Sequence, residues 1–164
     1  MLNNNFYKTL AVALANKNLP SAMINTDGLV KDINSGTNIP QYLFDAIYTS
    51  AVLTTKNSRG MVFGTGSTPP EMDDYWLSGE FITTLSGIAH QLTVDTSNGA
   101  ISITKKVTVQ NNGTASVTVN EMGLLASNGS NYEMIDRVVF DSPLTLAPGE
   151  QGVITYTLNM PIPQ

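Results

Sequence analysis

The chain contains no cysteine among its 164 residues. A disulfide bond, a thiol nucleophile and a cysteine-ligated metal are therefore excluded, and packing and assembly have to provide stability. Histidine occurs once, and a single histidine without a recognisable nucleophile motif is weak support for catalysis. No stretch approaches the roughly 20 apolar residues of a membrane-spanning helix. We expect neither a catalytic site nor a membrane association.

Charged side chains are scarce as well. They make up 13% of the chain, against about 25% in an ordinary soluble domain, and Thr, Ser and Asn supply the polarity instead. Such a surface costs less to desolvate than a charged one, which suits a protein that packs against neighbours, although an unusually neutral enzyme would share this composition. The net charge of −5 argues against nucleic-acid binding, because that requires clustered Lys and Arg.

The second half of the chain alternates polar and apolar residues, and only a strand has that period. Ile101, Ile103, Val107 and Val109 share one parity, and glycine-containing turns separate the alternating segments. Five strands and a shorter one are predicted near 86–96, 99–110, 115–126, 132–141, 152–160 and 61–63. Their spacing is typical of an antiparallel β-sandwich, of jelly-roll or Ig-like Greek-key type, over residues 61–164.

Within the strand near 115–126 the apolar parity slips from Val117 and Val119 to Met122 and Leu124. A slip of this kind arises when one strand carries an extra residue. The sequence therefore predicts a β-bulge near 120–121.

Residues 1–60 form the other predicted unit, a helical N-terminal arm or anchor. Apolar residues at i, i+4 and i+8 predict a helix that the asparagines at 3–5 cap and that ends near Asn16, and a second helix is predicted after Pro40. A polar loop with a short strand at 29–31 joins them. The helices either cover one face of the sandwich or reach a neighbouring subunit. The candidate subunit contacts are Phe6, Leu10, Leu14, Leu43, Phe44, Ile47 and, in the C-terminal tail, Ile162.

One loop carries the residues that we considered as a ligand site. Asp74, Tyr75 and Trp76 follow a glycine-rich stretch and make a candidate ligand loop, in which the aromatic pair either stacks on a sugar or belongs to the core. The acidic residues at 71, 73, 74 and 80 suggest a cation site or hydrolysis, but their spacing does not match an EF-hand loop and a structural role is favoured. The glycines at 64 and 66 lack the further residues of a nucleotide-binding loop. We assign no catalytic residue, no metal ligand and no cofactor.

Two titratable residues fall inside predicted strands. His90 shares the parity of Ile88 and Leu92, which predicts a side chain that faces partly inward. Lys105 interrupts the apolar parity of its strand, so we expect it to point toward the core side. There it pairs with a carboxylate such as Glu121 or Asp136, or it reaches solvent at the edge of the sheet.

The order of motifs over residues 61–160 resembles that of small structural proteins of tailed bacteriophages and prophages. The similar segments are Val62–Pro70, Asp74-Tyr75, Leu77–Gly79, Lys106–Gly113, Val117–Leu124, Asp136–Pro143, Leu146–Glu150 and Val153–Leu158. Residues 1–60 match this pattern only loosely.

The resemblance implies a β-sandwich virion component that works by assembly and has no active site. The motifs do not fix the position of the chain in the particle. We expect a capsid decoration or head-fibre-associated protein, because the sequence has no long fibrous repeat or tube-like pattern. The alternatives are a neck, tail or baseplate component, or a glycan- or receptor-binding module of the virion. The expected partners are other virion proteins and further copies of the chain, with no nucleic acid and no membrane. The expected location is the virion, assembled in the host cytoplasm.

Overall fold

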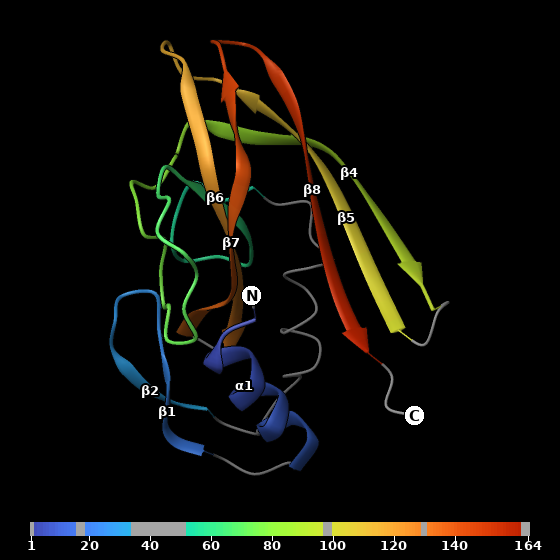
Figure 1. The fold of residues 1–164 in the computed structure, drawn as a ribbon. Coiled ribbons are helices and arrows are strands. Elements are labelled where there is room, and N and C mark those ends of the chain that lie inside the picture. The colour runs from blue at the N-terminus through green and yellow to red at the C-terminus, as the bar shows by residue number, and fades with distance from the viewer. Residues whose placement is uncertain (1, 16–18, 34–51, 97–99, 129–130, 162–164) are drawn as a thin grey trace.

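The computed structural model describes residues 2–15, 19–33, 52–96, 100–128 and 131–161, and these are mainly β-structure with one short N-terminal helix (Figure 1). This confirms the predicted mainly β fold class with a helical start. The elements are α1 (Asn4–Ala15), β1 (Leu19–Ile24), β2 (Val30–Ile33), β3 (Gly60–Gly64), β4 (Leu85–Asp95), β5 (Ala100–Asn111), β6 (Val117–Asn128), β7 (Asn131–Leu146) and β8 (Gln151–Pro161).

The strands form three antiparallel sheets. The β1–β2 hairpin is a sheet of its own. The other two sheets are three-stranded and have the orders β3-β6-β7 and β4-β5-β8. In Figure 1 the β4-β5-β8 sheet lies opposite β6 and β7, while α1 and the hairpin lie together at one end of the molecule. The strands that alternation predicted are all present, with ends shifted by a few residues.

The predicted bulge is confirmed. The pairing of β6 with β7 changes register between Val119 and Glu121, which is the place where the apolar parity slips. A second shift lies between Leu124 and Leu125 of the same strand. Since an extra residue turns the later side chains of a strand to the other face, the first bulge allows both halves of β6 to contribute to buried structure.

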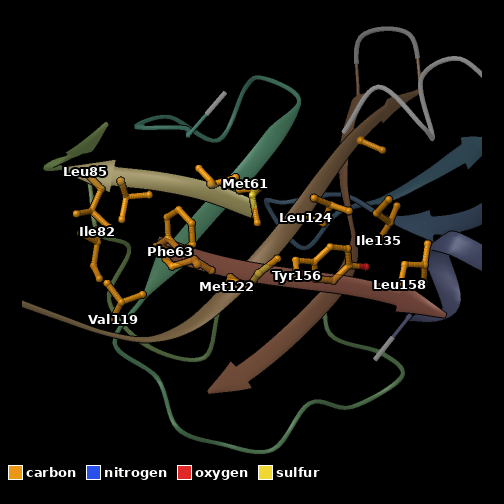
Figure 2. Packing of buried hydrophobic residues seen from close by; sticks show 14 of the residues in the cluster. Met61, Phe63, Ile82, Leu85, Val119, Met122, Leu124, Ile135, Tyr156 and Leu158 are labelled. Atoms are coloured by element: carbon orange, nitrogen blue, oxygen red, sulfur yellow. The ribbon is translucent and has the colours of Figure 1, made fainter. Parts of the chain in front are cut away.

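Side chains from the facing sides of both three-stranded sheets form the largest hydrophobic core. Figure 2 shows Met61 and Phe63 of β3 and Met122 and Leu124 of β6 in this core, together with Tyr156 of β8. All of them are at least 96% buried. Since burying a large apolar side chain stabilises a fold by about 1.5–3 kcal/mol, the two sheets depend on each other for stability.

Three polar side chains, Lys105, Tyr156 and Asp136, lie within or beside this core. Lys105 of β5 is fully buried, which confirms that it points to the core side, and it is opposite Tyr156 of β8 in the strand register. The hydroxyl of Tyr156 donates a 2.6 Å hydrogen bond to Asp136 of β7. Burial lowers the pKa of Lys105 to about 8, and burial together with the carboxylate of Asp136 raises that of Tyr156.

The N-terminal helix begins as the sequence predicts. The side-chain oxygen of Asn3 accepts a hydrogen bond from the backbone N–H of Phe6, which is the geometry of a helix N-cap. Phe6 is 4% exposed and belongs to the main core, and Leu10 packs against that core. The side-chain amide of Asn3 donates to the carbonyl oxygens of Met134 and Asp74, so the start of α1 is fastened to β7.

The prediction of a loop between the two N-terminal helices is wrong in part. Residues 19–33 contain the β1–β2 hairpin, of which the sequence indicated only a short strand at 29–31. Pro20 and Ser21, the latter with a φ of 49°, break the alternation of β1, so its sequence carries no strand period. The predicted helix after Pro40 lies outside the described residues.

The prediction for His90 is confirmed in part. His90 pairs with the buried Val107 in the register of β4 and β5, so it lies on the core side of the sheet. Its side chain is exposed and does not take part in the core. No helix in the described parts of the chain is long and apolar enough to cross a membrane.

Candidate functional site

A buried ionic network lies where β6 and β7 meet the segment between β3 and β4. Its centre is Glu121, which is 0% exposed and directly follows the bulge. Its carboxylate accepts hydrogen bonds from the backbone N–H groups of Gly66 (2.9 Å), Ser78 (3.0 Å) and Gly79 (2.8 Å), from the Ser78 hydroxyl (3.1 Å) and from Nε of Arg137 (2.8 Å). Burial alone would raise the pKa of Glu121, but these donors outweigh burial and hold the pKa below its usual value.

Arg137 of β7 connects Glu121 to the neighbouring loop. It is 1% exposed, and its Nη1 donates to Oδ2 of Asp74 at 2.7 Å while its Nη2 donates to the carbonyl oxygen of Thr68 at 2.6 Å. Burial lowers the pKa of Arg137, but the two carboxylates outweigh this effect and raise it. The same oxygen of Asp74 accepts from the backbone N–H of Glu71 at 2.7 Å and closes the turn at 71–74. Arg137 therefore remains charged and fixes two separate loop segments.

Two glycines make this network possible. A Cβ atom on Gly66 would lie 2.3 Å from a carboxylate oxygen of Glu121 and 2.5 Å from the backbone nitrogen of Gly79. A Cβ on Gly79 would in turn lie 2.2 Å from the backbone nitrogen of Gly66. Real side chains do not tolerate such distances, so the two backbones approach each other only because neither residue has a side chain.

The network brings together several of the sequence motifs of residues 61–160. Val62–Pro70, Asp74 and Leu77–Gly79 follow one another closely in the sequence. They meet Glu121 and Arg137 through contacts between residues that are 42 to 69 positions apart. Each charged group in it already has hydrogen-bonded partners within the chain. The physical role of these motifs is therefore to attach the long β3–β4 connection to the β3-β6-β7 sheet.

A cleft of about 390 Å³ lies on the outer side of this connection. One wall is the tip of the β1–β2 hairpin, with Thr26 and Asp27, and the other wall is formed by Glu71 and residues 73–78. Lys56 contributes from a third segment. The structure thus places all three residues of the candidate ligand loop, Asp74, Tyr75 and Trp76, at one concave surface.

The two aromatic residues of the cleft have different environments. Trp76 is half-buried and packs edge-on against Phe81, with 5.4 Å between ring centroids. Nζ of Lys56 lies 4.8 Å from the centroid of the Trp76 ring, in cation–π geometry. Tyr75 is 43% exposed, and its ring lies against the backbone of Gly28 at the hairpin tip. Tyr75 is therefore the more accessible of the two rings.

The acidic residues of the 71–80 segment do not form a metal centre in the structure. Asp74 binds Arg137, and Oδ1 of Asp73 accepts from the side-chain amide of Asn4 at 2.6 Å. In the part of the chain that the structure describes, no group of three or more His, Asp or Glu side chains is arranged to hold a metal ion. The structural role favoured from the sequence agrees with the contacts of Asp74.

No protein-family model, curated protein or solved structure matches the chain. The bacteriophage resemblance therefore remains a prediction from the motifs. The chemistry of the network and of the cleft follows from their own contacts.

The candidate subunit contacts are placed only in part. Phe6 and Leu10 pack against the chain's own core, and Leu14 lies in α1, where its side chain is not described. The other candidates, Leu43, Phe44, Ile47 and Ile162, lie outside the described residues. The role of this segment as an anchor stays a prediction.

Sequence reasoning missed Glu133 of β7, which is buried where the sheet meets α1. Its Oε1 accepts a 2.9 Å hydrogen bond from the hydroxyl of Thr9, and its Oε2 has no hydrogen-bond partner among the described residues. Burial outweighs the Thr9 hydrogen bond and raises the pKa of Glu133 to about 7. The only signal in the sequence was a charged residue between two residues that alternation places in a strand.

Proposed function

We propose that this chain is a structural protein of a tailed-bacteriophage particle, built on a β-sandwich of jelly-roll or Ig-like type. Its most fitting position is on the head, as a decoration or fibre-associated protein, and a neck, tail or baseplate position is the alternative. It works by assembling with copies of itself and with other virion proteins, and we assign it no enzymatic step. The order of phage-like motifs over residues 61–160 supports this proposal.

The observation that carries the proposal is the free edge of β4. This strand is 11 residues long and pairs with β5 on one side only, and among the described residues no strand pairs with its other side. Residues 87–91 and 93–95 are exposed, and the only charge formally present in the strand at neutral pH is that of Asp95. Monomeric proteins normally protect such an edge with lysine, proline or a covering segment, because unpaired strands recruit other chains. Assembly would cover it.

The test is to purify particles from a host that carries the gene and to examine them by mass spectrometry and cryo-electron microscopy. The proposal predicts that the chain is present in intact particles at a stoichiometry set by particle symmetry, with density that contacts other virion proteins. Absence of the chain from purified particles, while it is expressed in the same cells, would contradict the proposal.

The structure changes how the N-terminal anchor has to be tested. Deletion of residues 1–50 would remove Phe6, which is part of the main core, and Asn3, which donates a hydrogen bond to Met134 of β7. A deletion variant that is not incorporated could therefore simply be misfolded. A substitution of exposed Tyr7 (52% exposed) by aspartate leaves these contacts in place. If α1 docks onto the particle, Tyr7→Asp lowers incorporation while the variant still folds, with only the edge contact between the Tyr7 and Phe6 rings lost.

A further inference from the structure

The walls of the cleft are held in place before any ligand arrives. At the hairpin tip the side-chain oxygen of Asn25 accepts hydrogen bonds from the backbone N–H groups of Asp27 (3.1 Å) and Leu29 (2.9 Å). The opposite wall is fixed through the 2.7 Å contact between Asp74 and buried Arg137. A rigid concave site avoids much of the entropy cost of ordering on binding, and its volume of about 390 Å³ is within the range of small-molecule sites.

The cleft contains several carboxylates and one ammonium group, and this combination restricts the charge of the ligands that it can bind. Asp27 and Glu71 are exposed carboxylates on opposite walls, Asp73 lies beside Glu71, and Lys56 is the basic residue among the lining side chains. Carboxylates accept strong hydrogen bonds and an ammonium group donates them. The excess of negative charge disfavours an anionic ligand. A neutral ligand with many hydroxyl groups can donate to the carboxylates and accept from Lys56.

The aromatic side chains supply the apolar part of the site. Tyr75 presents a 43% exposed ring at the cleft, and it is held against Gly28 on one side. The Trp76 ring already contacts Lys56 and Phe81, so it is less available than Tyr75 for stacking on a ligand. An amphipathic ring beside carboxylates matches a ligand that has both C–H faces and hydroxyl groups.

We propose that this cleft is a binding site for a short neutral saccharide, with Tyr75 as the stacking platform and with Asp27, Glu71 and Lys56 as its hydrogen-bonding groups. Binding needs neither the virion nor an oligomer, because all of these groups come from one chain. The proposal therefore stands or falls independently of the proposed structural role.

The protein carries its own reporter for this site, because Trp76 is the only tryptophan in the chain. We would titrate the full-length protein with maltose, cellobiose, lactose and N,N′-diacetylchitobiose and follow tryptophan fluorescence, with glycerol as the control for nonspecific solvent effects. Binding predicts a saturable change in intensity or emission maximum for at least one disaccharide and none for glycerol. The cluster of carboxylates predicts that sialyllactose binds more weakly than lactose.

Variants separate the cleft from the rest of the surface. Tyr75→Ala and Asp27→Asn should each weaken binding by about tenfold, the effect of losing a stacking ring or one charge-assisted hydrogen bond. Tyr7→Ala removes an exposed tyrosine of α1 that is not among the residues lining the cleft, and it should leave affinity unchanged. Circular dichroism and unfolding temperature confirm that each variant folds.

The proposal is overturned if none of the disaccharides produces a saturable change. It is also overturned if Tyr75→Ala folds and binds as tightly as the wild type, or if Tyr7→Ala loses affinity to the same extent as Tyr75→Ala. Tighter binding of sialyllactose than of lactose would refute the assignment to neutral saccharides.

Discussion

Glu133 is the residue whose ionisation should most affect stability. Its pKa is about 7 in the folded protein, against an ordinary value of 4.5, because it is buried between β7 and α1. Between these two pH values the folded state retains a proton that the unfolded state has released. The contribution of Glu133 to the free energy of unfolding is therefore highest below about pH 4.5. It falls as the pH rises to about 7 and is constant above that.

We predict that Glu133→Gln removes this pH dependence. The fall in unfolding free energy across that interval is about 3 kcal/mol in the wild type, and the glutamine side chain can still accept the hydrogen bond from Thr9. Urea unfolding at pH 5 and pH 8 measures the difference, with exposed Glu80→Gln as the control. An identical pH profile for the wild type and Glu133→Gln would contradict the assignment.

Arg137 should be among the least replaceable residues of the chain. Arg137→Met leaves Glu121 with its backbone donors but without its counter-charge, and it removes the donors to Asp74 and Thr68. Breaking a buried ion pair by removing one partner costs about 3–5 kcal/mol. Chemical denaturation measures this loss, and Lys106→Met, at an exposed position of β5, is the matched control. A loss below about 1 kcal/mol would show that solvent or another cation replaces the guanidinium.

At the scale of elements, Asn3 both caps α1 and attaches its first turn to neighbouring segments. Asn3 caps the helix through Phe6 and also donates to the carbonyl oxygens of Met134 and Asp74, so Asn3→Ala removes a cap and two tertiary hydrogen bonds. The cap alone contributes about 1 kcal/mol. Loss of the bonds to the buried carbonyl of Met134 and the part-buried carbonyl of Asp74 raises the expected total to about 2–3 kcal/mol. The adjacent Asn4→Ala, which removes only a surface bond to Asp73, should cost less than 1 kcal/mol.

Hydrogen exchange of α1 measures the same effect locally. Asn3→Ala should raise the exchange rates of amides in Asn4–Ala15 far more than those of β5. Equal destabilisation by Asn3→Ala and Asn4→Ala would contradict the special role of Asn3.

The elements that the sequence predicted well are those whose period survives in the residue pattern. The strands β4 to β8 are long, and one face of most of them is buried, so alternation identifies them. The bulge near Glu121 was predictable because a register slip changes parity. β1 was not predictable, because Pro20 and Ser21 interrupt it and its pairing depends on β2 and on contacts with α1.

The candidate site was predictable only in its residue types. Asp74, Tyr75 and Trp76 attracted attention as an acidic and aromatic group, but the hairpin tip that completes the cleft comes from a segment predicted as a loop. The Glu121–Arg137–Asp74 network joins residues up to 63 positions apart. Local pattern carries no information on such pairs, since they meet only where the β3–β4 connection packs on the β3-β6-β7 sheet.

For the whole molecule, the arrangement of the sheets leaves two kinds of surface. The cleft lies between the tip of the β1–β2 hairpin and the connection between β3 and β4, whereas the exposed edge of β4 belongs to the β4-β5-β8 sheet. None of the residues that line the cleft belongs to β4, so one chain can assemble through β4 and still present the cleft. The two proposals do not compete for the same residues.

Assembly through the β4 edge is testable in solution. We predict that the wild-type protein forms oligomers at high concentration and that Ala89→Lys shifts the equilibrium toward monomer, because a lysine on an edge strand opposes pairing with a second chain. The matched control is Thr108→Lys. Thr108 lies opposite Ala89 in the register but on the central strand β5, where it does not face a partner's strand. Sedimentation equilibrium of the three proteins gives the association constants, and we expect at least a tenfold loss for Ala89→Lys alone. A strictly monomeric wild type, or equal losses in both variants, would refute pairing through this edge.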